Sequence, residues 1–206
     1  MKLLRSCLFV VVLTAAVVGL GRVDADDTKI MVPPPPDTAK DKPLPAAFAK
    51  PTPEGLDDLK AIEKHVKEVL AKVLPCTVCV RASGSGSGII VSADGLVLTA
   101  GHVSGEPGRD ITILTPDGKT RKGKTLGGNG TIDSGLVKIT DPGPWPFVEM
   151  GRMADVKKGD WCVVTGHPGG FKPGRSPVVR VGRVLDINDR IAAQYIRTDC
   201  TLVGGD

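Results

Sequence analysis

Hydrophobic residues between positions 55 and 73 recur at steps of three and four, with charged residues between them. This period predicts one amphipathic α-helix, because a helical turn takes about 3.6 residues and the apolar side chains then share a face. Pro75 follows and favours the end of the helix. The apolar face consists of Leu56, Leu59, Ile62, Val66, Leu70 and Val73.

From Cys76 onward the pattern changes to short runs of β-branched residues that Gly, Asp and Pro interrupt. The interruptions at 93–95 and 116–118 favour hairpin turns. Many short strands without helices between them are typical of an antiparallel barrel or sandwich. Strands are predicted at 76–82, 88–92, 96–100, 110–115, 119–125, 134–139, 161–166, 178–187 and 193–198.

The first 25 residues have the pattern of a secretory signal peptide. Lys2 and Arg5 precede an apolar run from Cys7 to Leu20, and small residues end the segment at Ala25. The run is short for a membrane span of about 20 residues, although an uncleaved anchor is the alternative. The pattern predicts a secreted or periplasmic protein with no membrane contact beyond this signal.

The chain divides into three parts by composition. Residues 1–25 form the predicted signal peptide, and the proline-rich residues 26–54 form a predicted linker that stays in solvent. Residues 55–206 contain the predicted helix and the strands. The 206 residues are 41% hydrophobic, which is enough for one core of ordinary size.

The charge balance gives no reason to expect nucleic acid as a partner. The whole chain has 27 Lys and Arg against 23 Asp and Glu, a net charge of +4. Without residues 1–25, which hold three basic residues and one acidic residue, the balance is 24 against 22, or +2. No dense basic run with aromatic residues is present either.

Four cysteines follow the linker: Cys76, Cys79, Cys162 and Cys200. Export would allow disulfides, and four cysteines have 3 full pairings that the sequence does not distinguish. Cys76 and Cys79 have the spacing of zinc and redox motifs, but the β-branched residues between them favour a strand, and no second pair is present. We therefore expect core thiols or disulfides, with no metal and no cofactor.

His102 is the residue most suited to chemistry, because it follows the predicted strand at 96–100 and its side chain titrates near neutrality. The segment around it, GSGIIVSADGLVLTAGHV at 86–103, resembles the catalytic-histidine region of trypsin-like serine proteases of the HtrA (Deg) type. Three later segments match in order: TIDSGLVKI at 131–139, KGDWCVVTGHPGG at 158–170 and RTDCTLVGGD at 197–206.

The resemblance covers roughly residues 60–206 and implies an all-β fold. That fold is the trypsin-like double antiparallel β-barrel, incomplete at the C-terminus, here preceded by one amphipathic helix. It also implies a Ser-His-Asp triad, in which His102 acts as base and acid and Asp133 orients it. The backbone N–H of Gly205 would donate to the oxyanion. Thr201 matches a position in the wall of the specificity pocket, and the lack of an acid there favours small or apolar substrate side chains.

The nucleophilic serine of the family would follow Asp206, so we expect this sequence to be an inactive piece of a serine endopeptidase that forms an acyl-enzyme. Many family members carry asparagine where Asp206 stands. Peptides or unfolded proteins would be the substrates, and a homo-oligomer stays open. The alternative is a non-catalytic barrel that binds extended peptides by adding a strand. The residue after Asp206 distinguishes the two.

Overall fold

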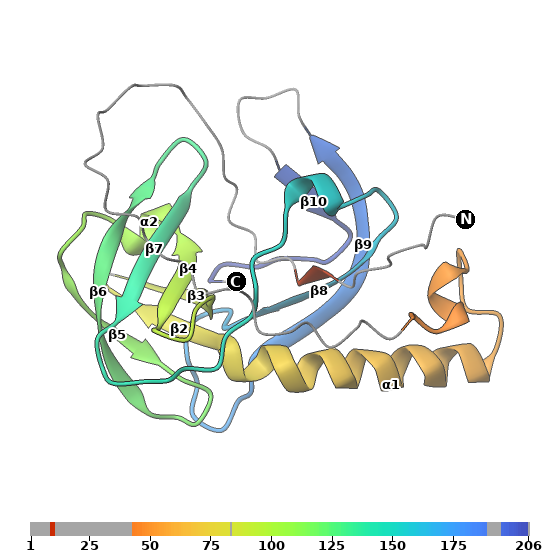
Figure 1. Cartoon of the computed structure of the whole chain (residues 1–206), viewed down its shortest axis with the longest axis horizontal. Coiled ribbons are helices and arrows are strands. Elements are labelled where there is room, and N and C mark those ends of the chain that lie inside the picture. Colours follow the sequence, from red (N-terminus) through yellow and green to blue (C-terminus); the bar gives the residue numbers. More distant parts are fainter. Residues whose placement is uncertain (1–8, 11–42, 83, 189–194, 206) are drawn as a thin grey trace.

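A computed structural model describes residues 9–10, 43–82, 84–188 and 195–205. Two β units lie side by side, a closed barrel and a four-stranded sheet, and the long helix α1 (Leu56–Val73) runs along one edge of both (Figure 1). The chain enters the barrel directly from α1 through a short 3-10 turn, η2 (Leu74–Cys76). This arrangement confirms a mostly β fold with one main helix.

Six antiparallel strands close the barrel in the order β2-β3-β4-β7-β6-β5. Their alternating apolar residues fill its interior, because successive side chains of a strand face opposite sides. Val78, Val80, Ile90, Val97 and Ile113 are completely buried there. The strands are β2 (Thr77–Arg81), β3 (Ser85–Ile90), β4 (Leu96–Ala100), β5 (Asp110–Leu114), β6 (Thr120–Asn129) and β7 (Ser134–Ile139).

The second unit is a sheet in the order β1-β8-β9-β10. Strands β8 (Trp161–Gly166), β9 (Val178–Asn188) and β10 (Tyr195–Thr198) are antiparallel, and β1 (Phe9–Val10) pairs with β8 in parallel. A short 3-10 turn, η3 (Met153–Asp155), lies before β8. The small core of this unit consists of Val156, Cys162, Val164, Val184 and Cys200.

Each predicted strand has an observed counterpart, although β3 covers Ser85–Ile90 and not the predicted 88–92. The bounds of β4, β7 and β8 are those predicted from the sequence, whereas β6 continues four residues past its expected end at 125 to Asn129. Residues 193–194, where the last predicted strand begins, lie outside the described residues. Apart from β1, so do the predicted signal peptide and residues 26–42 of the predicted linker.

Part of the predicted linker departs from the expectation of a solvated chain. Residues Ala46–Ala49 form a 3-10 turn, η1, and Phe48 is only 5% exposed. Its ring meets those of His65 on α1 and Trp161 on β8 edge to face, at centroid distances of 5.1 and 5.2 Å. This aromatic contact fastens α1 to the sheet. Within the ranges that the structure describes, no helix has the length and apolar character to span a membrane.

Candidate active site

His102 lies on α2 (Gly101–Ser104), a single helical turn directly after β4. The neighbouring strand β7 begins at Ser134, which pairs with Ala100 at the end of β4. The turn before β7 therefore faces the start of α2. Asp133 in that turn accepts the N–H of Gly101 with its carbonyl oxygen and the N–H of His102 with its carboxylate Oδ1, each at 2.9 Å.

The side chains of His102 and Asp133 also meet, although 31 positions separate them in sequence. Nδ1 of His102 lies 2.9 Å from Oδ1 and 2.8 Å from Oδ2 of Asp133. Asp133 is the only non-glycine residue with a positive φ, 49°, among the residues that the structure describes. An aspartate tolerates this left-handed conformation better than most residues do, and the conformation turns its carboxylate toward His102.

Hydrogen bonds from His102 keep the Asp133 carboxylate charged. Partial burial acts to raise the pKa of Asp133, but the backbone N–H and the imidazole of His102 outweigh burial and hold that pKa below its ordinary value. Asp133 is therefore an acceptor at neutral pH, so the neutral imidazole carries its proton on Nδ1 and leaves Nε2 able to accept another. The side chains are 72% and 54% exposed, so a substrate can reach them.

Close backbone packing holds α2 against the barrel. A Cβ at Gly128 on β6 would lie 2.9 Å from the Cα of Gly101, so a side chain there would push α2 away. Ser104 Oγ lies 2.9 Å from the carbonyl oxygen of Gly127 and 2.8 Å from that of Leu136. These contacts fix α2, and with it His102, to strands β6 and β7.

The last described residues return to the barrel. Ser87 Oγ on β3 donates to the carbonyl oxygen of Gly205 at 2.6 Å, and the N–H of Gly169 donates to that of Gly204 at 3.0 Å. In the described part of the chain, the hydrogen bonds of Gly205 thus involve its carbonyl and not its N–H. The Ser87 carbonyl accepts Thr99 Oγ1 at 2.8 Å, and Thr99 stands three residues before His102.

The remaining predicted site residue, Thr201, is exposed in the segment after β10. Asp206 lies outside the described residues. His167, which the sequence places in a turn, is 1% exposed, and neither of its ring nitrogens has a hydrogen-bond partner among the described residues. Sequence reasoning missed Ser87, because its partners are 80 and 118 positions away.

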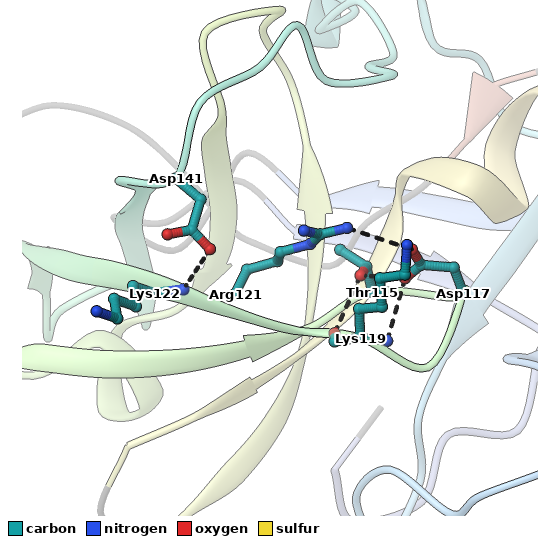
Figure 2. Close-up of polar contacts among 6 residues, drawn as sticks. All are labelled: Thr115, Asp117, Lys119, Arg121, Lys122 and Asp141. Atoms are coloured by element: carbon teal, nitrogen blue, oxygen red, sulfur yellow. Dashed lines mark hydrogen bonds and ion pairs between the residues drawn. The ribbon is translucent and has the colours of Figure 1, made fainter.

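The other acids near this region have structural partners. Asp117 closes the turn between β5 and β6, where it accepts the Thr115 hydroxyl, the Lys119 N–H and the Arg121 guanidinium (Figure 2). Asp141 accepts the N–H of Lys122 in the same view. In the described ranges no three His, Cys, Asp or Glu residues gather where they could hold a metal ion.

Comparison with known proteins identifies the family of the chain. The family described as "Trypsin-like peptidase domain" matches residues 86–206, more than half of the chain. The chain belongs to this family. A "Probable periplasmic serine endoprotease DegP-like" of Rickettsia conorii is 34% identical over 124 residues, which are 58% of this chain and 24% of that protein. A protein of the same description from Pseudomonas fluorescens is 30% identical over 158 residues, 73% of this chain and 32% of that protein.

This trypsin-like chain therefore spans about a quarter to a third of these curated relatives. Among solved structures, "HtrA-type protease AlgW with tripeptide" is 24% identical with a TM-score of 0.57, and the match covers 68% of this chain and 47% of that one. A second structure of AlgW with a tripeptide gives a TM-score of 0.58. These likenesses show the trypsin-like fold, and the curated relatives make the chain similar to HtrA-type serine proteases over the part that matches.

Proposed function

We propose that this chain carries the base, the orienting acid and an oxyanion donor of an exported serine endopeptidase. The observation that carries the proposal is the contact of Nδ1 of His102 with both carboxylate oxygens of Asp133 on an exposed surface. The family match supports it independently. The substrates are peptides or unfolded proteins, in the periplasm or outside the cell.

In this mechanism Nε2 of His102 takes the proton of a serine hydroxyl as that oxygen attacks the peptide carbonyl. The Asp133 carboxylate stabilises the imidazolium that forms, and His102 then gives the proton to the leaving amine. Water then attacks the acyl-enzyme while His102 takes its proton, and His102 returns that proton to the serine oxygen as the acid product leaves. The nucleophile belongs at the position after Asp206, so residues 1–206 alone are expected to be inactive.

Two residues shortly before Asp206 have further roles in the proposed site. The N–H of Gly205 donates to the oxyanion of the tetrahedral intermediate, which needs preorganised donors. Thr201 forms part of the wall of the specificity pocket. Because no charge stands at that position, the pocket prefers small or apolar side chains over Arg and Lys.

The experiment begins by reading the coding sequence beyond Asp206. The protein encoded by the whole gene, which includes the residue after Asp206, is then produced. We expect serine followed by two glycines, cleavage of denatured casein, and loss of cleavage when that serine is changed to alanine. Another residue type at this position, with binding of an extended peptide but no cleavage, would contradict the proposal and support a non-catalytic peptide-binding barrel.

A further inference from the structure

Ser87 joins three segments that are far apart in the sequence. Its Oγ accepts the backbone N–H of His167 at 2.8 Å and donates to the carbonyl oxygen of Gly205 at 2.6 Å. A hydroxyl has one proton to donate. Because the N–H of His167 must be the donor in its bond, the Ser87 proton is free for Gly205, and the direction of both bonds follows.

The two partners of Ser87 also meet each other. The N–H of Gly169, two residues after His167, donates to the carbonyl oxygen of Gly204 at 3.0 Å. In a trans peptide the carbonyl and the following N–H point in opposite directions. Holding the Gly204 carbonyl therefore aims the N–H of Gly205 away from the 167–170 turn. This N–H is the one assigned above to the oxyanion.

The 167–170 turn is itself rigidly built. Arg175 Nη2 donates to the carbonyl oxygens of Pro168 at 2.8 Å and Gly170 at 2.7 Å, and the N–H of Gly170 donates to the carbonyl of His167 at 2.8 Å. Gly205 has a φ of 93°, and a Cβ there would lie 2.9 Å from the nitrogen of Gly169. The contact thus requires glycine at 205, and a fixed turn beside it.

From this geometry we propose that Ser87 is a positioning residue for the oxyanion turn. It holds the Gly205 carbonyl directly, and it acts on the Gly204–Gly205 peptide through the 167–170 turn, whose Gly169 N–H binds the Gly204 carbonyl. The role rests on the function proposed above. Without the hydroxyl, the Gly205 carbonyl and the His167 N–H both lose their partner. The 167–170 turn then loses its bond to β3, and the Gly204–Gly205 peptide adopts orientations in which the Gly205 N–H no longer faces the oxyanion.

The first test needs no catalysis. Amide hydrogen exchange of His167 and Gly169 is followed by NMR in the wild-type chain and in Ser87→Ala, Ser87→Thr and Ser85→Ala. Ser85 is exposed on the same strand and serves as the control. We expect exchange at both amides to accelerate at least about tenfold in Ser87→Ala, and wild-type rates in Ser85→Ala and Ser87→Thr. Unchanged exchange in Ser87→Ala would overturn the proposal.

The second test uses the protein that includes the residue after Asp206. Loss of one oxyanion donor costs about 10²- to 10³-fold in kcat, so misdirecting Gly205 should lower kcat by roughly tenfold to a hundredfold. KM should stay within about twofold, because the ground-state carbonyl gains little from the oxyanion site. Ser87→Thr should recover most of the activity.

The outcomes separate the two proposals. If Ser87→Ala keeps wild-type kcat while His102→Ala abolishes turnover, the endopeptidase assignment stands and the role of Ser87 is wrong. If KM rises and kcat is unchanged, Ser87 acts in substrate binding, which also contradicts the role. If the wild type does not turn over at all although it folds, the endopeptidase assignment fails, and the exchange measurement still decides whether Ser87 holds the turn.

Discussion

Asp133 Oδ1 accepts a hydrogen bond from the backbone N–H of His102 at 2.9 Å and lies 2.9 Å from Nδ1 of the same residue. One carboxylate thus fixes the main chain and the imidazole of the same residue. The backbone bond alone would make Asp133 a structural residue at the start of α2. The ring contact adds what a general base needs, a set tautomer and a stabilised positive charge.

Replacing Asp133 with asparagine separates these two roles. In Asp133→Asn the amide oxygen can still accept the His102 N–H, but an NH2 group faces Nδ1 and favours the other tautomer. We expect kcat of the protein that includes the residue after Asp206 to fall about 10³- to 10⁴-fold. The free energy of unfolding should change by less than about 1 kcal/mol.

Asp110→Asn is the control for this measurement, because Asp110 is an exposed acid whose partner is Lys124 at 2.9 Å. It should leave kcat unchanged. Equal kcat values for Asp133→Asn and wild type would contradict the orienting role of Asp133.

Phe48 should matter for stability although it precedes α1 in a proline-rich segment. Its buried ring packs against His65 and Trp161, and its carbonyl accepts Trp161 Nε1 at 3.1 Å. Phe48→Ala should lower the free energy of unfolding by about 3 kcal/mol, measured by urea denaturation. Leu59→Ala, at a side chain 53% exposed on α1, should cost less than about 1 kcal/mol. Equal losses of unfolding free energy in the two variants would show that the Phe48 ring does not pack against α1 and β8.

The cysteines should remain thiols despite export. Cys162 pairs with Gly182 of β9, while Cys200 follows β10 on the other side of that strand. The Cys162 and Cys200 sulfur atoms are 4.0 Å apart, about twice the length of an S–S bond, as in packed core thiols.

Burial also makes Cys76 and Cys162 less reactive, since it raises the pKa of Cys76 to about 11 and, as the main cause, that of Cys162 to about 12. Under non-reducing conditions, Cys76, Cys79, Cys162 and Cys200 should resist alkylation in the native protein and react after unfolding in guanidinium. A peptide linked through Cys162 and Cys200 in the mass spectrum would contradict this geometry.

His167 should make stability depend on pH. Burial, as the main cause, lowers the pKa of the His167 imidazole, and nearby Arg175 acts in the same direction. The unfolded chain, with a histidine pKa of about 6.5, therefore binds the proton more readily, so stability falls as the pH drops below about 6.5.

The melting temperature of the wild type should decrease between about pH 7.5 and pH 5.5, and that of His167→Leu should decrease less. Parallel pH profiles for the two proteins would show that His167 is not buried in its neutral form.

Strand periodicity and turn residues located the barrel strands, because these signals are local. The bounds of β4, β7 and β8 follow directly from their apolar residues. The end of β6 did not follow, since Gly127 and Gly128 carry no hydrophobic signal and belong to the strand only through pairing with β7. The docking of Phe48 depends on Trp161, which lies 113 positions away.

The site residues likewise fall into those that the sequence indicates and those that only the structure shows. The resemblance named His102, Asp133 and Gly205, and the structure brings the first two into contact and the third to Ser87. No local pattern marks Ser87, because its role depends on a hydroxyl that meets two distant backbone groups. Nor does sequence show that His167, in a Gly-His-Pro-Gly turn, points its ring inward.

The most direct test of the central assignment is labelling with a fluorophosphonate probe, which reacts with an activated serine. The protein that includes the residue after Asp206 is labelled as wild type, as His102→Ala and as the control Ser85→Ala, with folding checked by circular dichroism. The account predicts one labelled serine at the position after Asp206, in wild type and Ser85→Ala, and none in His102→Ala. Folded wild-type protein that takes up no probe, or equal labelling in His102→Ala, would contradict it.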